Sequence, residues 1–255
     1  MAKITIFGSC RQDSVYNYYS VTPLRDQLTY PHYASETLQA IKYASGLISD
    51  NDIQTDIAFR SYLLDGKIRH QKKLKSDFLK TELFIVEIAS RKTYQFGSTY
   101  LHHIIEDPNY GCPDRSDIIK GFETEHEIEE KIIEMKTIFN PRPFFLVTHF
   151  YTKNSGIRYE LVKLIKRLGH KHNIPVFDPV EELGGLTVIR NYLENEEVLT
   201  HYNSEGHKAI GLKYVKFIET HFMFRSHYKL ISPTFLRKLK SKIISSINKF
   251  TGNDR

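Results

Sequence analysis

Residues 4–14 read Ile4-Thr5-Ile6-Phe7-Gly8-Ser9-Cys10-Arg11-Gln12-Asp13-Ser14. The β-branched apolar run over Lys3–Phe7 predicts a strand, and Gly8 with the small polar Ser9 ends it. Such a junction presents a side chain and backbone N–H groups at the carboxyl end of a sheet, where open α/β folds bind their ligands. Cys10, one of only two cysteines in the chain, sits in this turn. The turn is therefore the first place to expect chemistry.

Three further apolar runs predict strands at Leu83–Ala89, Phe144–Thr148 and Pro175–Asp178. Helical patterns lie between them, with Ser35 as the expected N-cap of the second helix: Gln12–Tyr19, the segment after Ser35, Glu125–Phe139, Arg158–His172 and Glu205–Phe222. This alternation predicts an α/β fold, a three-layer sandwich whose central parallel sheet carries helices on both faces. The stretch from Tyr94 to Glu123 is too long for an ordinary connection, so a lid, a local motif or a mobile loop is expected there.

The composition is that of a globular protein, with 255 residues, 40% apolar and 26% charged. This length suits one large domain, or one domain with an appendage. The absence of a run of about 18 apolar residues predicts no membrane-spanning helix, and the N-terminus does not resemble a signal peptide. Two cysteines do not form a disulfide framework, so a reducing, cytoplasmic setting is expected.

The positive charge is concentrated in the last residues. Residues 228–255 hold seven Lys or Arg against one acid, which accounts for the whole formal excess of +6. The predicted domains are therefore residues 1–226, an α/β domain, and residues 227–255, a basic amphipathic helical tail. With the charge in the tail and no nucleic-acid-binding motif, a nucleic-acid partner is not expected.

The tail itself has an apolar face on one side of a helix. Two interpretations remain open: peripheral contact with a membrane surface or with a binding partner, or docking on the chain's own domain or on a second copy. The face consists of Phe235, Leu239, Ile243, Ile247 and Phe250.

Cys10 is the leading candidate for chemistry. A cysteine at a strand end is often an inert buried residue. Here its neighbours Ser9 and Arg11 are polar, and the start of a helix favours the thiolate form. A thiolate is a competent nucleophile when a base lies near it.

A second candidate region is Val198-Leu199-Thr200-His201-Tyr202-Asn203-Ser204-Glu205-Gly206-His207, a loop that leads into the last helix. Late in an α/β chain such a loop returns to the carboxyl edge of the sheet, so His201 is the candidate general base. His207 is expected in the first helical turn, where it packs. His149, at the end of a buried strand, is expected to line the pocket.

The remaining histidines and the second cysteine carry weaker signals. His102-His103, and His170 with His172, lack recognisable metal-ligand spacing, so no metal site is predicted. Cys112 is interpreted as a bystander.

Taken together, Phe7-Gly8-Ser9-Cys10 and the later Thr-His-Tyr-Asn-x-x-Gly-His stretch resemble the SGNH/GDSL hydrolase superfamily. In that family a Gly-Asp-Ser turn after the first strand carries the nucleophile, and an Asp-x-x-His loop before the last helix carries the base. Here Ser9 stands where the family has Asp, and Cys10 stands where it has the nucleophilic Ser. A Cys at this position resembles a divergent branch that includes the Gly-Ser-Cys-Phe-Ala group and capsular-polysaccharide acyltransferase-like proteins. The similarity covers residues 3–222 in order and spacing.

The chain departs from the family pattern in two places. Val198 occupies the position of the expected acid, so either Glu196 or Glu197 substitutes, or the site works as a Cys–His dyad. The family's oxyanion-hole Asn has no match, because Ser90-Arg91-Lys92 follows the second predicted strand. Ser90 can donate to an oxyanion, and the two cations either bind a phosphate or carboxylate or form a solvated loop pair.

The resemblance implies an SGNH/flavodoxin-like fold with a C-terminal helical extension, and an acyl-transfer enzyme. The implied reaction is that of an O-acetyltransferase or esterase on a carbohydrate or polysaccharide, with Cys10 as nucleophile and His201 as base. Ser9, Arg11, Ser90 and Arg91 are the expected oxyanion or substrate contacts. No tightly bound cofactor is expected, and acetyl-CoA is the candidate acyl donor. The alternative is a non-catalytic module of the same fold that binds CoA or a sugar phosphate.

Overall fold

The computed structural model of the chain describes residues 3–24, 28, 30–59, 71–107, 115–194 and 201–224. The predicted tail helix lies outside these residues, as do Cys112 and residues 196–198. None of the described helices is both long enough and apolar enough to cross a membrane.

The centre of the molecule is a five-stranded parallel sheet with the order β2-β1-β3-β7-β8. Counted within this sheet, the order is 2-1-3-4-5, the flavodoxin-like arrangement. The predicted α/β class with a parallel sheet is confirmed. The two-residue strand β2 is the one that the sequence pattern did not predict, because it is too short to show an apolar run. The strands span Lys3–Phe7 (β1), Ser20–Val21 (β2), Leu83–Glu87 (β3), Phe144–Val147 (β7) and Val176–Phe177 (β8).

The sheet is buried on both faces, which explains the nearly continuous apolar runs of its strands. In β3, Phe84 and Val86 belong to one hydrophobic cluster, whereas Leu83 and Ile85 belong to the other. The same two-residue alternation holds in β7, as expected for side chains that point to opposite faces along a strand.

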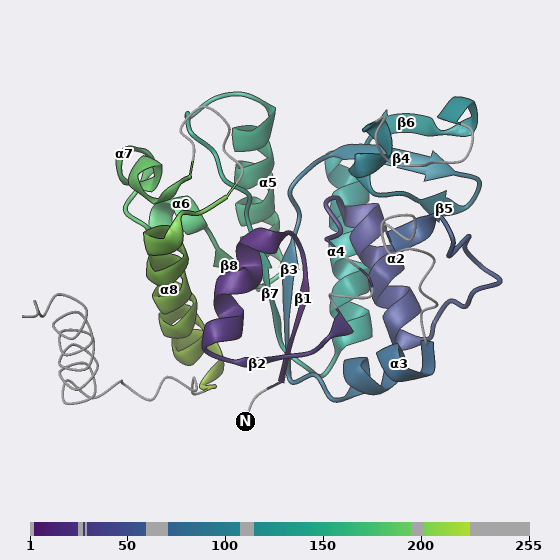
Figure 1. Cartoon of the computed structure of the whole chain (residues 1–255), viewed down its shortest axis with the longest axis horizontal. Helices are drawn as coiled ribbons and strands as arrows, with labels where there is room; N and C mark the ends of the chain where they lie inside the picture. The colour runs from purple at the N-terminus through teal and green to yellow at the C-terminus, as the bar shows by residue number, and fades with distance from the viewer. Residues whose placement is uncertain are drawn as a thin grey trace, which may run out of the picture.

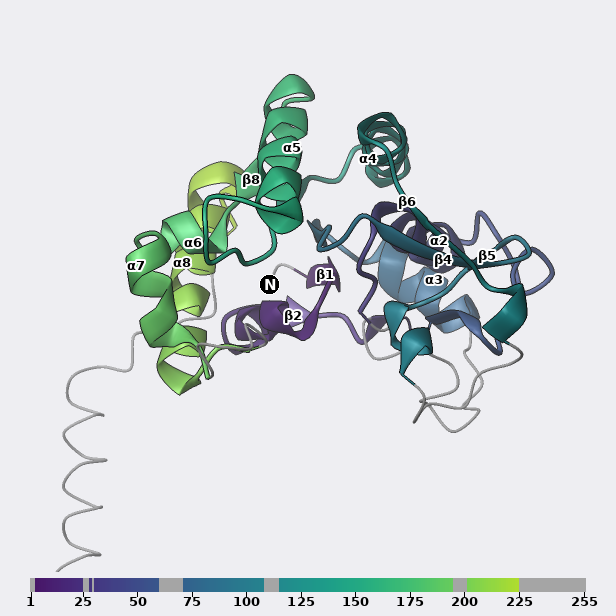
Figure 2. The same cartoon turned by 90° about the horizontal axis from the view of Figure 1, so that it is seen from above.

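Helices cover both faces (Figures 1 and 2). The helices α2, α3, α4 and α5 contribute apolar side chains to the first cluster. The 3₁₀-helix η1 and the helix α8, with the short α6, α7 and η5, supply the second. Their bounds are Cys10–Asn17 (η1), Ala34–Ser45 (α2), Gln71–Leu79 (α3), Glu125–Phe139 (α4), Ile157–Lys171 (α5), Pro179–Glu182 (α6), Leu186–Ile189 (α7), Arg190–Tyr192 (η5) and Ser204–Phe222 (α8).

The expected role of Ser35 as an N-cap is wrong. The cap of α2 is Tyr33, and Ser35 lies in the first turn. Its N–H and its hydroxyl both donate to the carboxylate of Glu123, at 2.7 and 2.6 Å, and the N–H of Ala34 donates to the same group. A distant carboxylate therefore satisfies the free N–H groups that a side-chain cap normally serves.

The stretch between Tyr94 and Glu123 contributes to a local motif. It forms a small antiparallel sheet with the order β5-β4-β6, spanning Lys92–Phe96 (β4), Thr99–Tyr100 (β5) and Ile119–Phe122 (β6). Two short 3₁₀-helices, His103–Glu106 (η3) and Arg115–Asp117 (η4), connect β5 to β6 around residues 108–114, which are not described. The buried Tyr33 ties this sheet to α2, because its hydroxyl is 2.9 Å from Tyr94 O and 2.7 Å from Leu101 O.

Candidate active site

The candidate site lies at the carboxyl edge of the parallel sheet, between β1 and β3. From β1 the chain crosses to β2 on one side and later to β3 on the other, so this is the topological switch point of the sheet. Open α/β sheets bind ligands in the crevice that such a reversal leaves. The turn Gly8-Ser9-Cys10 follows β1, Glu87 closes β3 and His149 follows β7.

The turn after β1 is held against the end of β3. The N–H of Ser9 donates to Glu87 Oε2 at 2.7 Å. A Cβ at Gly8 would lie 2.7 Å from Glu87 Cβ, closer than real carbon atoms approach. Only glycine fits here, since any side chain would push the turn away from the carboxylate. Cys10, partly exposed, is the first residue of η1.

Glu87 is the buried anion of the site, with 1% of its surface exposed. Burial raises its pKa, but the neighbouring His149, the Arg11 charge and the Ser9 N–H outweigh this and hold the pKa below its usual range. The carboxylate is therefore ionised at neutral pH. Its Oε1 lies 3.4 Å from His149 Nδ1.

The protonation of His149 follows from its neighbours. Arg11 NH2 lies 3.0 Å from His149 Nε2, and a guanidinium can only donate. Nε2 is therefore the acceptor, and Nδ1 carries the proton that faces Glu87. Burial and the positive charge of Arg11 lower the pKa of His149 to about 4, so the ring is neutral at pH 7.

A cavity of about 450 Å³ opens beside this network. It is lined by elements from across the chain, namely η1, the segment before α2, the loops after β3 and β7, the small antiparallel sheet, η3 and the first turns of α5. Its lining residues are Arg11, His32, Tyr33, Ala89, Ser90, Arg91, Lys92, Tyr94, His103, Glu106, Phe122, His149, Ile157, Arg158 and Leu161.

Three of the predicted substrate contacts, Arg11, Ser90 and Arg91, line this cavity, and so does His149, as expected. The Ser90 hydroxyl accepts a hydrogen bond from Lys92 N at 2.9 Å, which leaves its own proton available for donation. Arg91 Nε donates to Glu123 O at 2.8 Å, which fixes the guanidinium. Ser9 is buried next to the cavity wall, with Arg11 NH1 3.4 Å from its hydroxyl.

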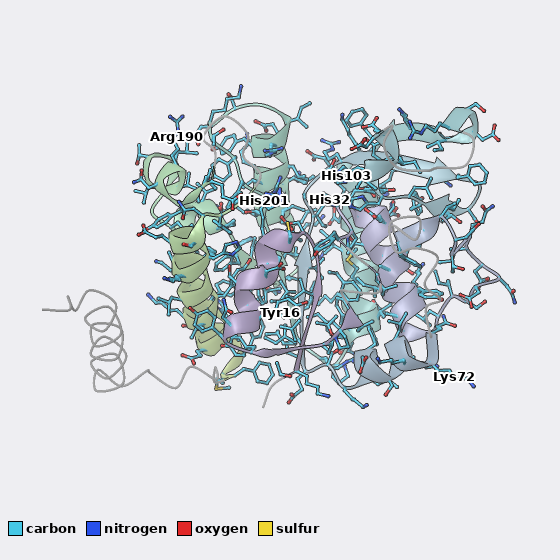
Figure 3. All side chains as sticks on the ribbon, viewed as in Figure 1. Tyr16, His32, Lys72, His103, Arg190 and His201 are labelled. Carbon is cyan, nitrogen blue, oxygen red and sulfur yellow. The ribbon has the colours of Figure 1, made fainter. Side chains whose placement is uncertain are left out.

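His201 lies outside the cavity lining, with 51% of its side chain exposed. Its Nδ1 is 4.0 Å from Glu194 Oε2, so an acid does stand beside it, although not one of those proposed from the sequence. Figure 3 shows His201 at the same end of the molecule as His32 and His103, above the carboxyl ends of the strands. The pairing of Cys10 with His201 stays a prediction.

The rest of the Asn-x-x-Gly-His motif is structural. Asn203 is the N-cap of α8, and its side chain accepts from the Gly206 N–H at 2.8 Å. A Cβ at Gly206 would lie 2.2 Å from Tyr192 O. His207 packs in the first turn of α8, as expected, with its Nδ1 2.9 Å from Ser14 Oγ.

Three histidines, His32, His102 and His103, bring ligand atoms within 4.8 Å of one another. His102 does not suit a metal, because its Nδ1 accepts from Ile104 N at 3.1 Å. A neutral ring then carries its proton on Nε2, whereas a metal-bound histidine normally donates from its second nitrogen. That Nε2 lies 3.1 Å from His32 Nδ1, which already donates to Tyr30 O at 2.6 Å. The tautomer of His102 therefore makes it a poor member of a metal-binding set.

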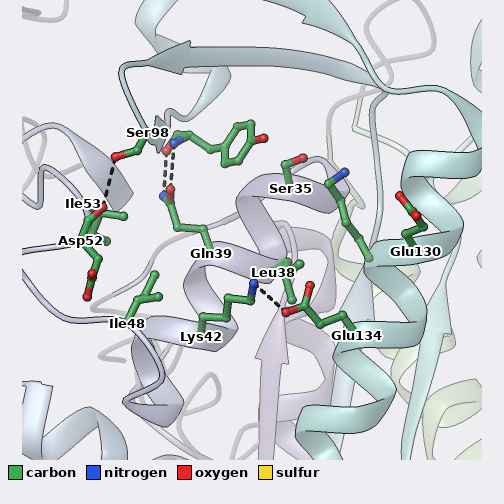
Figure 4. A pocket seen from close by; sticks show the side chains of 12 residues that line it. Ser35, Leu38, Gln39, Lys42, Ile48, Asp52, Ile53, Ser98, Glu130 and Glu134 are labelled. Carbon is green, nitrogen blue, oxygen red and sulfur yellow. Dashed lines mark hydrogen bonds and ion pairs between the residues drawn. The ribbon is translucent and has the colours of Figure 1, made fainter.

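A second cavity, of about 380 Å³, lies between α2, α4 and the β4–β5 turn (Figure 4). Several of its polar groups are already hydrogen-bonded or ion-paired within the protein. Gln39 exchanges two hydrogen bonds with the backbone of Tyr100, and Lys42 pairs with Glu134 at 2.6 Å. These contacts leave the cavity at the carboxyl edge as the stronger candidate.

Among known families, the chain matches the one described as the TviD N-terminal domain, over residues 2–105. The match covers less than half of the chain. It includes Cys10, Glu87, Ser90 and Arg91 but ends before His149 and His201. A comparison with curated proteins gives no match.

Among solved structures, a lipase/acylhydrolase from Enterococcus faecalis is 16% identical, with 86% of this chain and 96% of that chain covered and a TM-score of 0.42. A putative lipolytic protein of the G-D-S-L family from Desulfitobacterium hafniense is 12% identical, with 85% and 99% covered and a TM-score of 0.40. A catalytic mutant of Axe2, an acetylxylan esterase from Geobacillus stearothermophilus, is 10% identical, with 85% and 94% covered and a TM-score of 0.40. Likeness at this level says nothing about the reaction, which must be inferred from the site residues.

Sequence reasoning missed Glu87, Arg158 and Glu194. Glu87 had a signal, since it is a charged residue within the apolar run Leu83–Ala89, and a buried charge in a strand needs partners. Arg158 and Glu194 had none, because surface residues of those types are common and only the fold shows which of them border a cavity or a histidine.

Proposed function

We propose that the protein is an acyl-transfer enzyme, an O-acetyltransferase or esterase that acts on a carbohydrate. Cys10 is the nucleophile and His201 the general base. The observation that carries the proposal is that the turn after β1 is fixed against the end of β3. The fully buried, ionised Glu87 binds the N–H of Ser9, and the glycine before it allows the closest approach, so the residue that follows is held at the switch-point crevice.

In the proposed reaction, His201 removes the thiol proton and the Cys10 sulfur attacks the acyl carbonyl. The Cys10 backbone N–H and the Ser90 hydroxyl donate to the oxyanion that forms. As the intermediate collapses, the leaving group takes the proton from His201 and the acyl group remains as a thioester on Cys10. An acceptor hydroxyl, or water in an esterase, then attacks the thioester and regenerates the thiol. Acetyl-CoA is the proposed donor.

The test is mass spectrometry of the intact protein after incubation with p-nitrophenyl acetate. We expect one acetyl group on the wild-type chain and none on the Cys10→Ala variant. The matched control is Cys112→Ala, which removes the only other thiol and should acetylate as the wild type does. Acetylation of Cys10→Ala to the same extent as the wild type would exclude the thioester mechanism.

The second candidate is a non-catalytic module that binds CoA or a sugar phosphate. One observation favours it: the cavity is lined by Arg11, Ser90 and Arg91, but neither Cys10 nor His201 is among the residues that line it. On this proposal the same adduct experiment gives no acyl group on Cys10.

A further inference from the structure

The cavity at the carboxyl edge is unusually rich in positive charge. Four cations from three places in the chain line it: Arg11 in η1, the consecutive Arg91 and Lys92 where β4 begins, and Arg158 in the first turn of α5. The one carboxylate in the lining, Glu106, is already engaged. It accepts from the Tyr94 hydroxyl at 2.7 Å and pairs with Lys120 at 3.2 Å.

Two of these cations, Lys92 and Arg158, are not paired with an acid: among the described residues, no carboxylate forms an ion pair with either. Arg158 is exposed, and partial desolvation of its guanidinium together with the charge of Arg11 lowers its pKa, so the two guanidinium groups repel each other. The buried Glu87 offsets the charge of Arg11 and accepts from the Ser9 N–H, and it forms no ion pair with Lys92 or Arg158.

Arg11 supplies an independent sign that an acceptor is missing. Its NH2 and NH1 groups face His149 and Ser9, but its Nε is buried without a hydrogen-bond partner. Leaving a buried donor unmet costs about 1–3 kcal/mol, and more for a charged group. An anion in the cavity would balance the charge of this guanidinium and relieve the repulsion from Arg158.

The N-terminus of helix α5 adds to the positive electrostatic potential of the cavity. It is 15 residues long, its N-cap is Gly156, and no side chain caps its first N–H groups. Ile157, Arg158 and Leu161 of its first turns line the cavity. The N-terminus of a helix favours anions because its N–H groups are unpaired and its dipole is positive there.

We propose that this cavity binds a phosphate group of the ligand, between Arg11, Arg91 and Arg158. Four cations suit a doubly charged group, and about 450 Å³ leaves room for the rest of the ligand. Phe122 and Ile157, which are 62% and 72% exposed, provide an apolar rim for a sugar ring or an aliphatic chain. The phosphate belongs to an acyl donor such as CoA or to a phosphorylated sugar acceptor. This role in acyl transfer rests on the proposed function, but the binding itself does not.

The experiment measures binding of two matched pairs of probes to the full chain by calorimetric titration: coenzyme A against pantetheine, and glucose 6-phosphate against glucose. In at least one pair we expect the phosphorylated member to bind at least tenfold more tightly. A preference confined to coenzyme A assigns the phosphate to the donor, and one confined to glucose 6-phosphate assigns it to the acceptor. If neither phosphorylated probe binds tenfold more tightly than its neutral partner, the proposal is wrong.

Two variants on α5 locate the site. Arg158→Gln should weaken binding of the phosphorylated probe at least fivefold. Lys163→Gln, on the same helix and paired at the surface with Glu160, should leave it unchanged. Equal affinities of Arg158→Gln and wild type, with unchanged thermal unfolding midpoints, would overturn the assignment. Binding without any acyl adduct on Cys10 would remove the proposed enzyme and leave this inference standing, whereas an adduct without phosphate preference would do the reverse.

Discussion

At the scale of single residues, Glu87 connects the parts of the candidate site, although no sequence motif singled it out. One carboxylate at the end of β3 contacts the turn after β1 through Ser9 and the loop after β7 through His149. It also compensates the nearby charge of Arg11. A buried charge is costly unless it is paired and hydrogen-bonded. Here Oε2 accepts from the Ser9 N–H and the Arg11 charge is nearby, whereas Oε1 has no hydrogen-bond partner among the described residues.

The variant Glu87→Gln should therefore be strongly destabilised. The amide oxygen can still accept from Ser9, but the charge that offsets Arg11 is lost, and removing one partner of a buried ionic group costs about 3–5 kcal/mol. Chemical denaturation should show a lower free energy of unfolding. The control Glu160→Gln removes an exposed partner of Lys163 and should cost less than about 1 kcal/mol. If Glu87→Gln lowers the free energy of unfolding as little as the control does, the contacts of Glu87 do not stabilise the turn after β1.

At the scale of elements, the sequence motif at the start of α8 combines residues that fix the helix start with His201, the proposed base. Asn203 caps the helix, and its side-chain amide also donates to Asn191 O at 2.9 Å. Gly206 lets the first turn lie against the backbone of Tyr192. These contacts fix the loop that bears His201, two residues before the cap.

Gly206→Ala should displace this helix start. Its Cβ would lie 2.2 Å from Tyr192 O, so α8 or η5 must move. Overpacking of this kind costs about 1–3 kcal/mol. If His201 is the base, the same shift also lowers kcat/KM for acyl transfer. Thermal unfolding and ester turnover measure the two effects, with the exposed Lys208→Ala on the same helix as the control. Wild-type stability of Gly206→Ala would contradict the close approach.

At the scale of the whole molecule, the buried His149 and the partly buried His32 make stability depend on pH. Burial is the main cause that lowers the pKa values of His32 and His149 to about 4. At pH values below the ordinary histidine pKa of about 6.5, these two histidines bind protons in the unfolded chain but not in the folded chain. The free energy of unfolding should therefore fall as the pH drops from about 6.5 to about 4.

Denaturation measured across this range checks the prediction. Each unit of pKa shift corresponds to about 1.4 kcal/mol. His149→Gln should have a shallower pH dependence than the wild type, and the exposed His126→Gln should have the same dependence as the wild type. Identical slopes for all three chains would show that His149 is not held neutral by the fold.

Much of the whole-molecule architecture could be predicted because its strands are buried on both faces and appear as plain apolar runs. The helix over Glu125–Phe139 was predicted with its observed bounds. β2 could not be predicted, since two half-buried residues leave no pattern. The network of the site could not be predicted either. Arg11 and His149 are 138 residues apart, and they meet only through the order and register of the sheet.

This long separation has a consequence for how the protein is made. In the folded sheet β3 lies between β1 and β7, but β7 is synthesised some sixty residues after β3. Until it arrives, the charge of Glu87 lacks His149 beside it, and one long edge of β3 is unpaired. A nascent chain that ends near residue 105 should therefore remain sensitive to proteases and dependent on chaperones, and it should gain protection only when the strand bearing His149 leaves the ribosome.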